Sequence, residues 1–134
     1  MTLHLGDESG NEYTAANPIP TKVVGSVITV TQDSLANATN TITIAGVAGQ
    51  SIYVEAIEVA ISGAVAGNDI NVLLKDGTTT KWKTVIGSGA SRGTRVGMVL
   101  PMPIKITAGA NLILAVDAGG ASVITTANVA YEQK

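Results

Sequence analysis

The fold is decided most clearly by the stretch 70-INVLLKDGTTTKWKTVI-86. At its centre is Asp76-Gly77, a dipeptide that favours a tight turn between two antiparallel strands. Apolar residues occupy every second position before this turn, and Trp82, Thr84 and Ile86 share one parity after it. Because side chains alternate between the two faces of a strand, this period of two predicts a β-hairpin with one buried face.

The same alternation continues in both directions along the chain. Further apolar runs of this kind, separated by glycine-rich turns, occupy residues 23–31, 40–44, 96–106, 112–116 and 123–131. No stretch has a sustained helical period, and residues 33–37 are long enough for one helical turn at most. Eight or nine short strands predict an all-β fold, either an antiparallel β-sandwich or a jelly roll.

Two irregularities are expected within these strands. In residues 51–61, the apolar residues up to Ala56 share one face, and those from Ile57 onward have the opposite parity. Such a slip by one residue indicates a β-bulge or a corner. Pro101 and Pro103 lack the backbone N–H that a central strand needs, so they predict an edge strand or a corner.

Composition limits the classes of protein that fit. The chain has 134 residues, which is about one domain. Hydrophobic residues make up 46%, so the chain is not intrinsically disordered, and charged residues make up only 13%. The formal net charge of −2 gives no basic field for nucleic acid. There is no cysteine and no phenylalanine, so the core must be aliphatic and thiol chemistry is excluded.

The chain divides into an extended N-terminal arm, residues 1–20, and a β domain, residues 21–134. The arm is polar and ends in Asn17-Pro18-Ile19-Pro20, where two prolines favour extended backbone. No signal peptide is visible, and the apolar stretches are too short for a membrane helix. We therefore expect a protein made in the cytoplasm of its host, without membrane association.

No arrangement of residues predicts catalysis, a metal site or a cofactor. The only histidine is His4, in the polar arm, where nothing rigid would hold it as a general base. The glycine-rich stretch 87-GSGASRGT-94 lacks the lysine and the following helix of a phosphate-binding loop. We expect a protein that is not an enzyme and that uses no cofactor.

One segment of the body is basic. Residues 75–95 contain five Lys or Arg residues against the single acid Asp76, whereas the arm contains three acids and no Lys or Arg. This asymmetry makes four of the basic residues candidates for a contact between subunits: Lys81, Lys83, Arg92 and Arg95. Solvated loop charge is the alternative, and for Trp82 a place in the core is favoured over an exposed stacking role.

A resemblance to a known family is present in the segment 5-LGDESGNEYTAANPIP-20. It resembles the polar leader of small virion proteins of tailed bacteriophages, in which a Gly-Asn-x-Tyr stretch runs into Asn-Pro-hydrophobic-Pro ahead of a β domain. The body, with low charge, no cysteine and much Gly, Ala, Thr and Val, is similar in style to the capsid decoration, or cement, proteins of those phages.

The resemblance implies a small β-sandwich on the outside of a capsid, where it bridges neighbouring major capsid subunits as a homotrimer. The expected partners are the major capsid protein and further copies of the chain, and the expected location is the exterior of the virion. The leader supplies the candidate capsid contacts, which are Tyr13, Asn17, Pro18, Ile19 and Pro20. The alternative is a tail-fibre, receptor-binding or carbohydrate-binding β-sandwich module.

Overall fold

The computed structural model describes residues 26–134, and this part of the chain contains eight β-strands and no helix. The strands are β1 (Ile28–Asp33), β2 (Asn40–Ile44), β3 (Ile52–Ser62), β4 (Ile70–Asp76), β5 (Thr79–Ile86), β6 (Arg95–Lys105), β7 (Leu112–Val116) and β8 (Ile124–Gln133). The predicted all-β class is confirmed.

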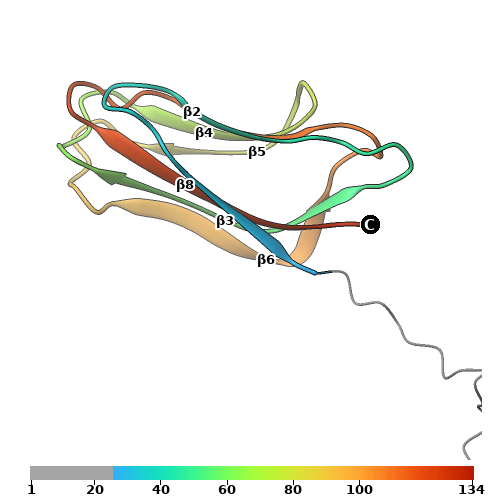
Figure 1. Cartoon of the computed structure of the whole chain (residues 1–134). Helices are drawn as coiled ribbons and strands as arrows, with labels where there is room; N and C mark the ends of the chain where they lie inside the picture. The colour runs from blue at the N-terminus through green and yellow to red at the C-terminus, as the bar shows by residue number, and fades with distance from the viewer. Residues whose placement is uncertain (1–25) are drawn as a thin grey trace, which may run out of the picture.

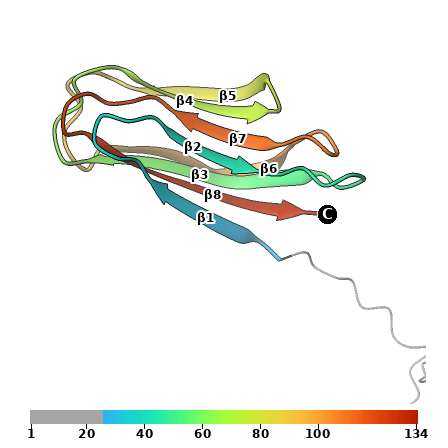
Figure 2. The same ribbon diagram turned by 45° about the horizontal axis from the view of Figure 1, so that its top comes forward.

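The strands form two four-stranded antiparallel sheets that pack as two layers (Figure 1). One sheet has the order β1-β8-β3-β6 and the other β2-β7-β4-β5, so that β7 lies between β2 and β4 (Figure 2). The first strand pairs with the last, the second with the seventh, the third with the sixth and the fourth with the fifth. This pattern arises when one long hairpin is wrapped into two layers, and it is the topology of a jelly roll.

The tip of that long hairpin is the turn predicted at Asp76-Gly77. Asp76 pairs with Thr79, and β4 and β5 run antiparallel from there to the pair of Ile70 with Ile86. Gly77 has a φ of 58°, a left-handed conformation that glycine adopts without steric cost. The Asp-Gly turn predicted from the local sequence is therefore also the tip around which the whole fold is wrapped.

The core lies between the two sheets and is almost entirely aliphatic. Val, Ile and Leu side chains supply most of it, with the most deeply buried contributed by β3, β4 and β7. Trp82 on β5 pairs with Leu74 and packs against this core while half-buried. Its inward orientation agrees with the structural role expected from the sequence.

The irregularity predicted in residues 51–61 is a β-bulge in β3. The register shifts between Val54 and Ala56 against both neighbouring strands, which makes Glu55 the extra residue. Val54 and Ile57 are both buried, whereas Ala56 lines a depression on the outer face of the sheet. Placing Ala56 on the same face as Val54 was therefore wrong, because the phase changes one residue earlier than the apolar pattern suggests.

Pro101 and Pro103 lie in β6. This strand is at the edge of its sheet, which is one of the two positions predicted for the prolines. Opposite the bulge in β3, the pairing of β6 jumps from Val99 to Ile104, so the four residues between them leave the ladder. Residues 33–37 form no helical turn. They end β1 and enter a turn in which Asn37 has a φ of 52°.

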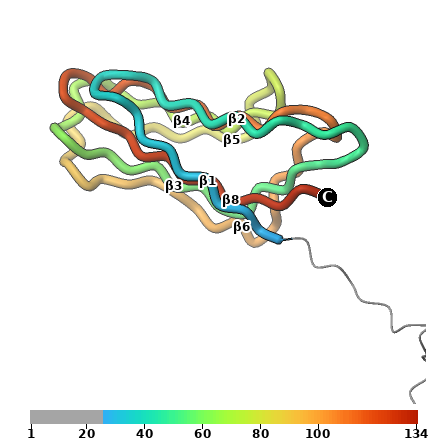
Figure 3. The backbone as a smooth tube through the Cα atoms, in the orientation of Figure 1, coloured from blue at the N-terminus to red at the C-terminus, as the bar shows by residue number. Residues whose placement is uncertain are grey.

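The loops that follow β1, β3, β5 and β7 gather at one end of the sandwich (Figure 3). Backbone hydrogen bonds join them: Ala66 donates to the carbonyl of Ala90 at 3.0 Å, and Gly67 to that of Gly119 at 2.8 Å.

Ile28, near the start of the described chain, pairs with Tyr131 near the C-terminus. Within residues 26–134, no helix is long and apolar enough to cross a membrane.

Candidate interaction face on the outer sheet

The outer face of the β1-β8-β3-β6 sheet carries three rows of side chains that run across all four strands. The registers of the three strand pairs define these rows. In order from β1 to β6, they are Thr29, Ala130, Ala56 and Val99; Thr31, Asn128, Glu58 and Gly97; and Asp33, Thr126, Ala60 and Arg95. Most of these side chains are small, so the middle of the face is recessed.

A depression of about 480 Å³ occupies this face. Its lining includes Ala56, Gly97 and Ala130, with the taller side chains of Glu58 and Arg95 beside them. The depression exists because three adjacent strands place alanine or glycine where their rows meet. A surface of this kind suits close contact with another backbone or a flat protein surface rather than enclosure of a small molecule.

Gly97 is required by its neighbours. A Cβ at this position would lie 2.5 Å from the carbonyl oxygen of Ile57 and 3.0 Å from the Cα of Glu58. A side chain here would force β6 away from β3, because distances below 3.0 Å to backbone atoms do not occur for real Cβ atoms. The glycine thus permits close approach of the two strands and also keeps the depression open.

The edge strand beside the depression is unusually apolar. Val99 is 83% exposed and Met102 is 81% exposed, and Pro101 and Pro103 are exposed as well. The strand contains no acid and has a cation at each end, Arg95 and Lys105. An exposed apolar edge with free backbone groups is a surface that proteins normally cover or pair.

The basic residues expected at a subunit contact fall into two groups. Lys81 and Lys83 lie on β5, the edge strand of one sheet, whereas Arg95 begins β6 in the other sheet, and Arg92 lies in the connecting loop. All four are exposed. Arg95 alone lines the depression.

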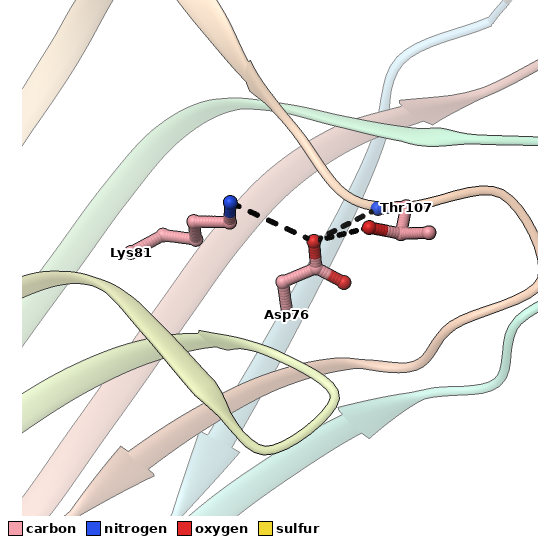
Figure 4. Close-up of polar contacts among 3 residues, drawn as sticks. All are labelled: Asp76, Lys81 and Thr107. Atoms are coloured by element: carbon pink, nitrogen blue, oxygen red, sulfur yellow. Dashed lines mark hydrogen bonds and ion pairs between the residues drawn. The ribbon is translucent and has the colours of Figure 1, made fainter.

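Lys81 has a local role as well. Its Nζ lies 3.9 Å from Oδ2 of Asp76, a carboxylate that is 9% exposed. The same oxygen accepts hydrogen bonds from the backbone N–H of Thr107 at 3.0 Å and from its hydroxyl at 2.7 Å (Figure 4). Asp76 therefore joins the β4–β5 turn to the loop after β6, and we assign it a structural function.

A cluster of polar side chains lies on the outer face of the β1-β8-β3-β6 sheet, near the C-terminus. Tyr53 pairs with both Lys105 and Glu132 across the strands. The ammonium of Lys134 lies 5.1 Å from the centroid of the Tyr53 ring and 3.3 Å from a carboxylate oxygen of Glu132. These cation–π and ion-pair contacts hold the C-terminus against the sheet.

The candidate capsid contacts of the leader, Tyr13, Asn17, Pro18, Ile19 and Pro20, lie outside the described residues. Among residues 26–134, no group of three or more His, Cys, Asp or Glu side chains is placed to hold a metal ion.

Sequence reasoning missed the depression and the exposed part of β6. It recognised the apolar run of residues 96–106, and the signal it passed over was Val99, whose parity is opposite to that of Val96, Met98 and Leu100. Met102 between two prolines was a second such signal. The row of small side chains could not be recognised, because it is assembled from strands far apart in the sequence.

No family model matches the chain, and no curated protein matches it either. Among solved structures, the chain is similar to the cryo-electron microscopy structure of a virus-like particle of extra small virus from the giant freshwater prawn Macrobrachium rosenbergii. The identity is 18%, the alignment covers 98% of this chain and 94% of that one, and the TM-score is 0.32.

Proposed function

We propose that this protein is a structural virion protein that decorates the outside of a tailed-bacteriophage capsid and bridges neighbouring major capsid subunits. The observation that carries the proposal is the apolar edge strand β6 beside a low, small-residue sheet face, on a domain with few charges. The leader that resembles phage virion proteins supports the choice of capsid. No catalytic step or cofactor belongs to this function.

The mechanism would be mechanical. Interface cores are depleted in charged residues, and the row of Thr29, Ala130, Ala56 and Val99 across the outer sheet face meets that condition. Each contact of one small domain is weak, but many identical contacts in a symmetric shell act together. A homotrimer bound through three leaders would increase the effective concentration of each leader at its site on the capsid.

The carbohydrate-binding or receptor-binding alternative has less support. Sugar sites in proteins usually present exposed aromatic rings. In the described part of the chain, Tyr131 is buried, Trp82 packs against the core, and Tyr53 lies beneath two lysines. None of these rings lines the depression.

Cryo-electron microscopy of phage particles that carry the protein tests the proposal. We expect density for the jelly roll on the outer surface of the head, at positions where major capsid subunits meet. Particles that lack the protein should lose their DNA at a lower temperature, or at a magnesium concentration that complete particles still tolerate. Density at the tail tip, or density only inside the head, would overturn the proposal in favour of a receptor-binding or internal role.

A further inference from the structure

We propose that copies of this protein join head to tail, with the β6 edge of one copy paired to the β1 edge of the next. This inference deepens the proposed function, on which it rests, because it assigns the contact that would form the cluster. It commits the β6 edge to one occupant, a second copy of this chain.

The two edges are available and belong to the same sheet. In the order β1-β8-β3-β6, the strands β1 and β6 are the end strands. Each hydrogen-bonds to one neighbour only within the described structure, so each presents backbone donors and acceptors along its outer side.

The directions of the strands suit such a contact. Each neighbouring pair in the sheet is antiparallel, so with three pairs between them, β1 and β6 run in opposite directions. A second copy placed to continue the sheet therefore offers β1 antiparallel to β6. The sheet would extend with the same pairing geometry that it has inside one copy.

The register of this continuation brings opposite charges together. The outer-face rows that end in Arg95, Gly97 and Val99 on β6 begin with Asp33, Thr31 and Thr29 on β1. Extending each row into the next copy sets Arg95 directly opposite Asp33. Opposite charges in this position stabilise a pair of strands, whereas like charges destabilise it.

Both charges lack an ionic partner within residues 26–134. Asp33 is exposed, and within residues 26–134 the one side-chain hydrogen bond to its carboxylate comes from the hydroxyl of Thr126, which donates to Oδ1 at 2.6 Å. Its second carboxylate oxygen is therefore open to a guanidinium from another copy.

The inner face of the same contact is apolar. The register places Met98, which is 37% exposed, opposite Val30 of the next copy, which is half-buried in the monomer. Pairing would cover both side chains. It would end at Val99, because Pro101 and Pro103 have no N–H to donate and residues 100–103 leave the ladder.

The rival contact, β6 against β6 about a two-fold axis, is less favourable. The strand carries Arg95 and Lys105 at its ends and no acid. An antiparallel pair centred on Leu100 would set these cations opposite one another, and a pair centred on Gly97 would leave Arg95 opposite Val99. Only the head-to-tail contact supplies β6 with a carboxylate directly across the strand boundary. Repetition of such a contact closes into a ring when the rotation allows, and the homotrimer that the resemblance implies would be a ring of three.

Charge reversal tests the contact in solution, without any capsid. Sedimentation velocity over a range of protein concentrations should show that Arg95→Glu and Asp33→Arg each weaken association by about tenfold or more. The combined variant should restore association to within about threefold of the original protein. Lys75→Glu, a charge reversal on β4 of the other sheet, is the control and should leave association unchanged.

Disulfide trapping tests the register, and the cysteine-free chain gives a clean background. In the variant Thr29→Cys/Val99→Cys, the two sites of one copy are separated by three strand spacings, about 14 Å, which is too far for an internal bridge. Mild oxidation should therefore yield covalent trimers on a non-reducing gel, and each single variant should yield none.

Two results would overturn the inference. In the first, both single charge reversals weaken association but the combined variant does not restore it. In the second, the double-cysteine variant stays monomeric after oxidation. The proposed function fails separately: rings that form in solution but leave the capsid undecorated would contradict decoration and leave the ring contact intact.

Discussion

At the scale of single residues, Asp76 shows how one side chain can serve two levels of structure. Its position before Gly77 starts the tightest turn of the fold. Its carboxylate also accepts two hydrogen bonds from Thr107, thirty-one positions further along the chain (Figure 4). The same residue therefore specifies the β4–β5 turn locally and attaches it to the loop between β6 and β7.

Replacement of Asp76 by alanine should lower the free energy of unfolding by about 2 kcal/mol, because hydrogen bonds to a charged acceptor are lost at a buried site. Urea denaturation followed by Trp82 fluorescence measures this change. Lys81→Ala is the control and should cost less than about 1 kcal/mol, since the lysine is largely exposed and lies 3.9 Å from the carboxylate. Equal effects of the two variants would show that the ion pair, not the hydrogen bonds, provides the stability.

At the scale of elements, the hairpin of β4 and β5 and the edge strand β6 have opposite properties. The hairpin buries Ile70, Val72 and Leu74 and is closed by a turn whose backbone suits glycine. Strand β6 exposes apolar side chains and interrupts its own ladder with two prolines. The stability of one copy thus explains the hairpin, whereas the apolar exposure of β6 is what the proposed contact with a second copy would account for.

The turn can be tested with two glycines that differ in backbone conformation. Neither Gly77 nor Gly87 would bring an added Cβ within 4 Å of another atom, but only Gly77 has a positive φ, of 58°. Gly77→Ala should therefore destabilise the protein by about 1 kcal/mol, and Gly87→Ala should change stability by less than about 0.5 kcal/mol. Thermal unfolding of both variants measures the difference, and an equal cost for both would refute a conformational cause.

At the scale of the whole molecule, the hydrophobic core and the proposed attachment to the capsid involve different parts of the chain. The core described here is formed by residues between Ile42 and Tyr131. The leader, residues 1–20, carries the resemblance to phage virion proteins and the candidate capsid contacts. This division separates folding from binding in a way that truncation can test.

Deletion of residues 1–17 should leave the melting temperature within about 4 °C of the full chain, the shift that about 1 kcal/mol produces in a domain of similar size. Binding to capsids that lack the protein, measured by co-sedimentation, should fall by about tenfold or more. Substitution of Val85, an exposed residue on β5, by threonine provides a control that should alter neither quantity. A large loss of stability with unchanged binding would reverse the assignment of the two regions.

The sequence by itself determined the all-β class and the Asp76-Gly77 hairpin. It also predicted a bulge or a corner in residues 51–61 and an edge strand or a corner at Pro101 and Pro103, and the structure has the bulge and the edge strand. Each of these follows from local rules: the alternation of side chains along a strand, the conformational freedom of glycine and the missing N–H of proline. These rules placed Ala56 on the wrong face of the sheet, because an alanine fits a buried face and an exposed one equally well.

Only the tertiary structure decided the strand order, the depression and the placement of Arg95 in the same row as Asp33. The four residues of each outer-face row come from β1, β8, β3 and β6, which are as much as about one hundred positions apart in the chain. No local pattern encodes such a row, because its members meet only after the long hairpin has wrapped into two layers. The interaction face is therefore a property of the registers between strands, and the sequence supplies it only through the completed fold.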